Sequence, residues 1–298
     1  MLLERLLDNL ALSVEAFATC RVARGWRLRL PALDWVTFHY VVQGEGAVDD
    51  GVGRTAELPA GALAVVPPHL LHSLLCGAPP YGEGPGGGGQ MRSGMPDHLA
   101  GPTDEEALVV VCGRVEVTYG GSLGLFDQLD GVLVLDFSED TAMRATFEAM
   151  LQEVRSGRPG ARAMTSTLMR ACLIRVFREL CLHDDCSVGW LRALDDPTLA
   201  PVLHAMLSHP EEPHSVASLA ARAYMSRSAF ARRFRDSFGQ PPLEYLRGIR
   251  LRHAAELLRR SPPLPIPAVA RRSGFASRSQ FSRAFRAHFG YPPSELRA

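Results

Sequence analysis

The first part of the chain shows the short-period pattern of β-strands. Residues 17–75 and 107–137 contain short apolar runs, and turn-forming glycine, proline and aspartate residues separate these runs. The clearest runs, 36–42 and 108–112, are rich in valine and aromatic residues. Strands at this spacing are typical of a barrel or a sandwich. Residues 77–106 interrupt them with a glycine- and proline-rich run, and we expect a flexible insertion there.

From about residue 139 the apolar spacing changes to that of helices. Residues 139–156 and 161–183 carry apolar positions at intervals of three and four, and a third helical stretch, 190–207, contains two prolines. We assign 139–200 as a helical connector. A packed connector and a dimerisation surface are the two interpretations of these helices.

The strongest signal is an internal repeat at an offset of 51 residues. Residues 226–242 read SRSAFARRFRDSFGQPP, and residues 277–293 read SRSQFSRAFRAHFGYPP. A short apolar helix and a tight turn precede each copy, so each copy is the second helix of a helix-turn-helix unit.

The residues of the repeat explain why each copy forms a helix. Ser226 and Ser277 are placed to cap the helix N-termini, and glycine followed by proline ends each helix. Phenylalanines recur every four residues and predict one buried face per helix. That face comprises Phe230, Phe234 and Phe238 in the first copy and Phe281, Phe285 and Phe289 in the second.

Charge separates the repeat region from the rest of the chain, although the formal net charge of the whole sequence is zero. Residues 214–298 hold 16 arginines and four acidic residues, a net +12, so the remaining 213 residues carry −12. A basic segment of this size is expected of nucleic-acid binding. Arginine can donate two hydrogen bonds to guanine, and serine can bond base edges or phosphates. The faces opposite the phenylalanines present Ser228, Arg232 and Arg235 in the first unit, and Ser279, Arg283 and Arg286 in the second.

The repeat and its surroundings resemble the DNA-binding domain of AraC-type transcription regulators over roughly 204–297. The resemblance rests on the paired pattern S-x-S-x-F-x-x-x-F and on the extended second motif that begins at Gly274-Phe275. It implies an all-α domain, 201–298, with two recognition helices that read double-stranded promoter DNA, and action on the transcription machinery, with activation as the expectation. By motif position, the base-reading residues are Arg227, Ser228, Ala231 and Arg232, and in the second unit Arg278, Ser279, Ser282 and Arg283. Because the first unit has small side chains at 228, 229 and 231, we expect the second unit to read more of the sequence.

Two fragments of the β-rich part resemble the cupin barrel that serves as the sensor in such regulators. The pattern Gly61-x5-Pro67-x-His69-x2-His72 is similar to the second cupin motif, and His39 lies in the region of the first motif, which lacks its usual His-x-His. We therefore predict an α+β chain with an N-terminal cupin-like β-barrel at 1–138, the helical connector and the C-terminal domain.

Three interpretations of the sensor histidines are open. His39 and His72 could bind a divalent metal, with His69 or Cys76 as a further ligand, and imidazole and thiolate favour zinc. They could instead line a pocket for a small organic effector, or be ordinary barrel residues.

Two cysteines suggest a different signal. Cys20 stands beside Arg21 and Arg24, which could lower its pKa, and Cys112 ends an apolar strand. The resemblance includes regulators that respond to oxidants, so a redox sensor at Cys20 and Cys112 competes with buried, inert cysteines.

The leading hypothesis is a DNA-binding regulator, not an enzyme, that an effector, a metal or an oxidant controls through the N-terminal domain. The alternative is a metal-dependent cupin enzyme with an appended basic DNA-binding module. A homodimer is a further expectation. No apolar run approaches the ~20 residues of a membrane span, and acids replace the positive charge of a signal peptide at the N-terminus, so we expect a cytoplasmic protein.

Overall fold

The computed structural model describes residues 7, 10–79, 81–83, 97–102, 107–119, 123–127, 129–182, 193, 196–260 and 263–297. The chain divides into two compact bodies. The sheet body comprises Leu12–Val117 and Leu129–Leu182, and the helical body comprises Met1–Ala11, Thr118–Gln128 and His183–Ala298. Each body has its own hydrophobic core.

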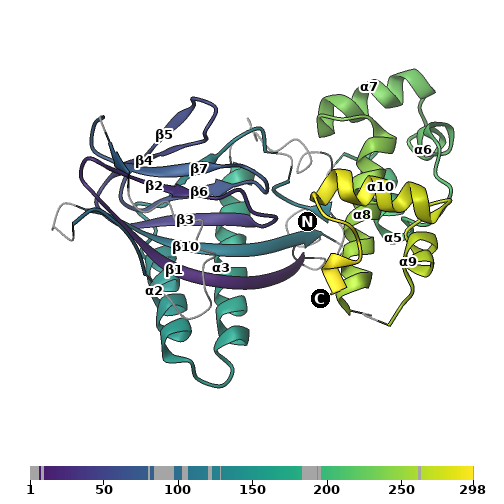
Figure 1. The fold of residues 1–298 in the computed structure, drawn as a ribbon. Coiled ribbons are helices and arrows are strands. Elements are labelled where there is room, and N and C mark those ends of the chain that lie inside the picture. The colour runs from purple at the N-terminus through teal and green to yellow at the C-terminus, as the bar shows by residue number, and fades with distance from the viewer. Residues whose placement is uncertain are drawn as a thin grey trace. The chain divides into compact units, whose positions relative to one another are not determined.

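The strands form two mixed sheets (Figure 1). The larger sheet has the order β12-β6-β3-β10-β1-β9, and β11 pairs with the end of β10. Its strands are β1 (Leu10–Ala23), β3 (Val36–Gln43), β6 (Ala62–Val66), β9 (Asp97–Ala100), β10 (Ala107–Tyr119), β11 (Leu123–Gly124) and β12 (Leu133–Asp136). The smaller sheet has the order β5-β4-β7-β2-β8. Its strands are β2 (Trp26–Leu30), β4 (Gly46–Asp49), β5 (Thr55–Leu58), β7 (His72–Cys76) and β8 (Gly82–Glu83).

The core of the sheet body lies on the inner faces of both sheets. Alternate residues of each strand point to the same face, so Val41 of β3, Leu74 of β7 and Val110 of β10 meet in one buried cluster. The predicted cupin-like β-rich domain is confirmed, with its strands paired as two sheets. The described pairings of these strands do not close into a ring.

The expected insertion contains more regular structure than its composition predicts. Residues 97–100 form β9, which pairs in parallel with β1 and places His98 in register with Cys20. Residues 82–83 form β8 on β2. Backbone hydrogen bonds to an open strand edge explain these strands, because they depend little on side-chain type. Residues 84–96 lie outside the described residues.

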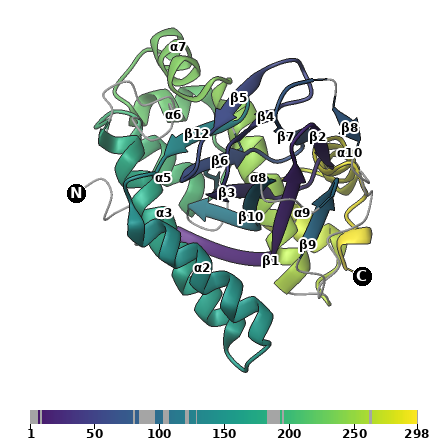
Figure 2. The same cartoon turned by 90° about the vertical axis from the view of Figure 1, so that its left-hand side faces the viewer.

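Two helices cover the outer face of the larger sheet. Helices α2 (Thr141–Ser156) and α3 (Ala161–Leu182) lie side by side (Figure 2). Phe147 of α2 stacks on Tyr40 of β3 with ring centroids 4.6 Å apart. The helices predicted at 139–156 and 161–183 are therefore present, and they belong to the same compact body as the strands.

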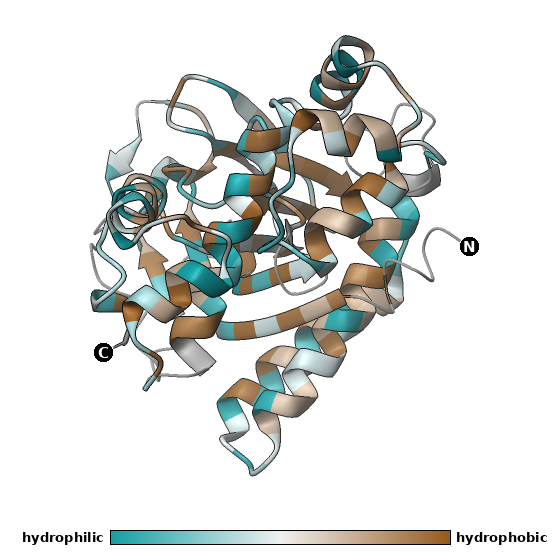
Figure 3. Ribbon diagram, turned by 90° about the vertical axis from the view of Figure 1, so that its right-hand side faces the viewer, coloured by the Kyte–Doolittle hydropathy of each residue, from teal (hydrophilic) through white to brown (hydrophobic). Residues whose placement is uncertain are grey.

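The helical body is built from short helices around a longer one. They are α5 (Ala200–Ser208), α6 (Val216–Arg222), α7 (Arg227–Phe238), α8 (Pro242–Arg260), α9 (Ile266–Arg272), α10 (Arg278–Phe289) and the 3-10 helix η1 (Glu295–Arg297). Hydrophobic and hydrophilic residues alternate around these helices (Figure 3). Within the described residues, no helix combines the length and hydropathy that a membrane span requires.

Candidate DNA-binding surface and sensor site

Helices α7 and α10 begin and end as the repeat predicts. Ser226 accepts a hydrogen bond from the backbone N–H of Ala229 at 3.3 Å, and Ser277 accepts one from Gln280 at 3.2 Å. A glycine in the left-handed conformation follows the last residue of each helix: Gly239 has φ of 71°, and Gly290 has φ of 81°. These caps satisfy helix-end groups that would otherwise lack partners.

The phenylalanine faces are the core of both units. Phe230, Phe234, Phe281 and Phe285 are all fully buried. Consecutive rings contact one another along each helix, with centroids 5.6 Å apart for the first pair and 5.5 Å for the second. These side chains hold each helix against the body, so the opposite face is turned outward.

The outward faces carry guanidinium groups without protein partners. Six arginines are exposed, and no hydrogen bond or ion pair of their side chains is found among the described residues. They are Arg227, Arg232 and Arg235 on α7, and Arg278, Arg283 and Arg286 on α10. Ser228 and Ser279 are exposed as well, whereas Ala231 and Ser282 are half-buried. Both helices thus present a cationic, hydrogen-bonding surface.

Other arginines of the helical body are used internally. Arg233 on α7 holds Asp196 through Nε and Nη2 at 3.1 and 2.6 Å. Arg252 on α8 forms an ion pair with Asp127 at 2.7 Å. Sequence alone does not separate these arginines from the outward ones, because all of them lie in similar arginine-rich helices.

Burial acts to raise the pKa of Asp196, but hydrogen bonds from Thr198 and Arg233 outweigh it, so the pKa falls to about 2. Asp196 also accepts a hydrogen bond from the backbone N–H of Thr198 at 2.8 Å, at the start of the segment that enters α5. The first recognition helix is therefore anchored to α5 by a carboxylate that stays ionised.

The two helix-turn-helix turns differ in length and conformation. Backbone hydrogen bonds run from Met225 to Ala220 and from Phe275 to Ala270, so the turn residues correspond at an offset of 50, one less than the offset of the recognition helices. Tyr224 and Gly274 then occupy equivalent positions, and both have positive φ, 54° and 76°. Tyr224 is 96% exposed.

A thiol and two imidazoles meet inside the sheet body. His39 Nδ1 lies 3.1 Å from Cys112 Sγ, and His39 Nε2 lies 2.8 Å from His72 Nε2. His72 Nδ1 lies 3.1 Å from the carbonyl oxygen of Leu70. The three side chains come from β3, β10 and β7, which places them on inner faces of both sheets.

Cys20 completes this cluster from β1. Cys20 and Cys112 belong to the same buried cluster, close enough for Cys20 to act on the pKa of Cys112, and both thiols are free. The pKa of Cys112 is raised well above its usual value, mainly by burial and to a smaller extent by the nearby Cys20. The pKa of His39 is held far below its usual value, mainly by burial and to a smaller extent by the neighbouring His72. Burial also lowers the pKa of His72 to about 4. Cys112, His39 and His72 are therefore neutral near pH 7.

The structure joins residues that the sequence divided between two hypotheses. Cys20 and Cys112 were the redox pair, and His39 and His72 the metal pair, yet the four residues form one cluster. Arg21 does not share the face of Cys20, because neighbouring residues of a strand point to opposite faces. His98, which sequence reasoning missed within the expected insertion, is in register with Cys20.

The other proposed metal ligands lie elsewhere. His69 is exposed in a left-handed turn, where Nδ1 is 3.4 Å from Asp34. Cys76 contacts the carbonyl oxygen of Glu45 at 3.7 Å. Among the described residues, no three histidine, cysteine or acidic side chains are grouped to hold a metal ion.

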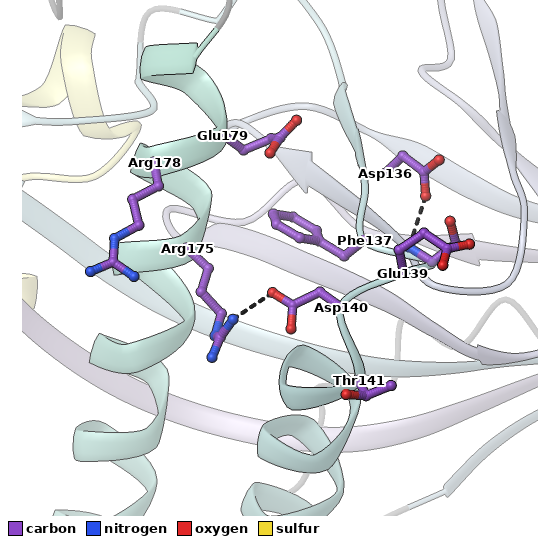
Figure 4. A pocket seen from close by; sticks show the side chains of 9 residues that line it. Asp136, Phe137, Glu139, Asp140, Thr141, Arg175, Arg178 and Glu179 are labelled. Atoms are coloured by element: carbon purple, nitrogen blue, oxygen red, sulfur yellow. Dashed lines mark hydrogen bonds and ion pairs between the residues drawn. The ribbon is translucent and has the colours of Figure 1, made fainter.

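A separate pocket of about 450 Å³ opens between the start of α2 and the end of α3 (Figure 4). Arg175 pairs with Asp140 there at 2.6 Å, and Asp140 also caps α2. The remaining lining includes three acidic residues, Asp136, Glu139 and Glu179, and the basic Arg178. The pocket lies on the outer side of the larger sheet, away from the inner faces that carry the thiols.

Comparison with known proteins gives the family. Residues 2–181 match the cupin family, and residues 219–298 match the helix-turn-helix domain family. A putative AraC-like transcription regulator of Streptomyces antibioticus is 36% identical over 45% of this chain and 46% of its own length. The chain is an AraC-type transcription regulator with an N-terminal cupin domain. It is a DNA-binding protein by its helix-turn-helix domain.

Further similarities extend over the whole chain or over its C-terminal domain alone. The RCS-specific HTH-type transcriptional activator RclR of Escherichia coli K12 is 27% identical, over 93% of this chain and 90% of its own. The DNA-binding domain of AdpA, solved with a target DNA, is 39% identical over 34% of this chain and 90% of that chain, with a TM-score of 0.32. ToxT from Vibrio cholerae, solved with an unsaturated fatty acid, is 14% identical over 95% of this chain and 94% of that chain, with a TM-score of 0.45.

Proposed function

We propose that this regulator reads promoter DNA with α7 and α10 and that the cupin domain controls this binding in response to an oxidant. The observation that carries the first part is the pair of phenylalanine-backed helices with six exposed, unpartnered arginines among the described residues. Helices of this kind fit the major groove, where arginine distinguishes guanine from the other bases.

The α8 helix gives the two reading helices a fixed separation. Its buried residues, which include Leu246, Ile249 and Leu258, belong to the body's cores. Two helices on one rigid body would enter successive major-groove segments about 34 Å apart. The proposed site is therefore asymmetric, with two patches of sequence read by one chain.

The experiment is selection of bound duplexes from a randomised pool, followed by affinity measurements at several salt concentrations. We expect Arg283→Ala to weaken binding to the selected duplex by about 1–3 kcal/mol and to relax specificity at one position. We expect Arg232→Ala to act in the same way but more weakly. Arg158→Ala, in the turn between α2 and α3 of the sheet body, is the control and should leave affinity unchanged.

Two results would contradict this part of the proposal. If no duplex is enriched and binding shows no salt dependence, the two helices do not read DNA. If Arg283→Ala lowers affinity equally on selected and random duplexes, Arg283 contacts the backbone and does not read a base.

The oxidant part of the proposal rests on the contact between Cys20 and Cys112. RclR, which matches nearly the whole chain, is described as RCS-specific. Two adjacent thiols can be oxidised to a disulfide, which changes how β1 and β10 are held together. A two-electron oxidant removes the two electrons, and the two thiol protons leave with its reduced product.

The sensor is tested by treating the protein with hydrogen peroxide or hypochlorous acid. Peptide mapping should reveal a Cys20–Cys112 disulfide, and affinity for the selected duplex should change with it. Cys20→Ser and Cys112→Ser should each abolish the change, whereas Cys172→Ser, which removes a buried thiol of α3, should not. Oxidant-independent DNA binding by the wild-type protein would exclude this sensor.

The remaining expectations concern partners. We propose action on the transcription machinery at the promoter, and a homodimer whose existence sedimentation would test. Zinc and the metal-dependent enzyme are tested together by metal analysis of the purified protein.

A further inference from the structure

The carbonyl of Leu70 fixes the direction of the hydrogen bonds that link His72, His39 and Cys112. A carbonyl oxygen only accepts, so His72 Nδ1, 3.1 Å away, carries a proton and donates it. In a neutral ring the other nitrogen is then an acceptor, so His72 Nε2 accepts from His39 Nε2. The same reasoning makes His39 Nδ1 an acceptor.

The direction continues to the thiol. Because His39 Nδ1 has no proton, it is the acceptor in the 3.1 Å contact with Cys112 Sγ, and the Cys112 thiol donates the hydrogen bond. The carbonyl oxygen of Val110 lies 3.9 Å from the same sulfur and is the more distant acceptor. The chain therefore runs from Cys112 to His39, to His72, to Leu70.

We propose that His39 is a built-in general base for Cys112, that His72 holds His39 in the tautomer whose Nδ1 accepts, and that Cys112 is the sulfur that reacts first with a two-electron oxidant. The inference rests on the proposed oxidant sensing and adds to it the order of the thiols and the fate of the proton.

The groups facing Cys112 are few. Cys20 faces it from β1, His39 from β3 and, one step further, His72 from β7, while His98 of β9 is in register with Cys20. Among the described residues, no carboxylate or guanidinium hydrogen bonds with Cys112 or acts on its pKa, so the imidazole of His39 is the base within reach.

The chemistry balances with hydrogen peroxide as the oxidant. The Cys112 sulfur attacks one peroxide oxygen while its proton passes to His39, the O–O bond breaks, and His39 returns that proton to the departing hydroxide, which leaves as water. Cys112 is then a sulfenic acid. The Cys20 thiol attacks that sulfur, a second water leaves, and the disulfide forms.

Cys172 is a matched control within the same molecule. It is buried and free like Cys112, and burial raises its pKa to about 12. The ionisable groups that act on it are Arg175 and Asp140, and no imidazole is among them. Its oxidation requires prior loss of the proton to solvent, whereas that of Cys112 does not.

The experiment measures the rate at which each cysteine of the full-length protein reacts with hydrogen peroxide between pH 6 and pH 8, by quenching and peptide mass spectrometry. We expect the Cys112 rate to be nearly independent of pH and the Cys172 rate to rise about tenfold per pH unit. In Cys20→Ser, sulfenic acid should accumulate on Cys112. In Cys112→Ser, Cys20 should stay reduced.

His39→Gln keeps a hydrogen-bonding side chain but removes the base. We expect it to slow Cys112 oxidation at pH 7 by about tenfold or more and to give Cys112 the pH slope of Cys172. Thermal unfolding checks that the variant is folded. If the variant does not fold, the pH dependence of Cys112 and Cys172 oxidation in the wild-type protein still tests the inference. Equal slopes for the two wild-type cysteines, or first oxidation at Cys20, would overturn the inference. A flat Cys112 profile with oxidant-independent DNA binding would instead support His39 as the general base and remove the proposed sensor.

Discussion

The two helix-turn-helix units share their cores and differ in their attachments. Both recognition helices begin at a serine cap, bury a phenylalanine face and end at a left-handed glycine. Only the first is tied to a neighbouring helix by the Arg233–Asp196 pair, because Ala284 stands at the corresponding position of α10. Duplication has thus preserved what folds each unit, while the contacts that fix its orientation have diverged.

The largest expected effect tests whether the two cores are equivalent. Phe234→Ala and Phe285→Ala each remove a fully buried ring, and each should lower the free energy of unfolding of the helical body by about 3–5 kcal/mol. Urea denaturation followed by circular dichroism measures both. A cost below about 1 kcal/mol at either position would show that the phenylalanine face of that unit is not packed as its partner is.

A smaller effect tests the anchor. The folded pKa of Asp196, about 2, lies below the unfolded value, so its carboxylate stabilises the fold above about pH 4, and this contribution is lost as the pH falls through 2. With allowance for solvent screening, we expect Asp196→Asn to cost about 1 kcal/mol at pH 7 and progressively less below pH 4.

Hydrogen exchange measured helix by helix makes this test specific. The Asp196→Asn variant should exchange faster in α7 and unchanged in α10, which has alanine in place of the anchoring arginine. Equal acceleration in both helices would mean that Asp196 supports the whole body and not the first unit.

The smallest effect concerns the turns and has opposite signs in the two units. Tyr224→Gly should stabilise the protein by about 0.5–1 kcal/mol, because glycine adopts positive φ without strain but loses more chain entropy. Gly274→Ala should destabilise it, because a Cβ there would lie 2.7 Å from Arg250 Nε and 2.9 Å from the Pro210 carbonyl oxygen. Melting temperatures compare the two, and a loss of stability in Tyr224→Gly would show that the exposed ring has a structural role.

Sequence was sufficient where local spacing decides the structure. The caps, the phenylalanine faces, the glycine ends and the bounds of α8 all follow from residue types at fixed intervals. The same spacing predicted α2 and α3 closely. Together with the paired motif, it predicted the fold class, and it indicated the two helices that we propose to bind DNA.

Sequence was insufficient where distant strands must be aligned. Cys112 and His39 are 73 positions apart, and only the register of β10 against β3 brings them together. The role of Leu70 has no sequence signal at all, because it acts through its backbone carbonyl. The one-residue difference between the turns, by contrast, is visible in the sequence, because Tyr224-Met225-Ser226 corresponds to Gly274-Phe275-Ala276-Ser277.

That difference in turn length has a practical consequence for building chimeras. Exchanging α7 and α10 between the units from their serine caps onward would transfer the reading surface and leave each turn intact. A graft that also included α6 and α9 would insert or delete one residue and carry Tyr224 into the crowded site beside Arg250. The serine caps are therefore the natural boundaries for redesigning which DNA each half reads.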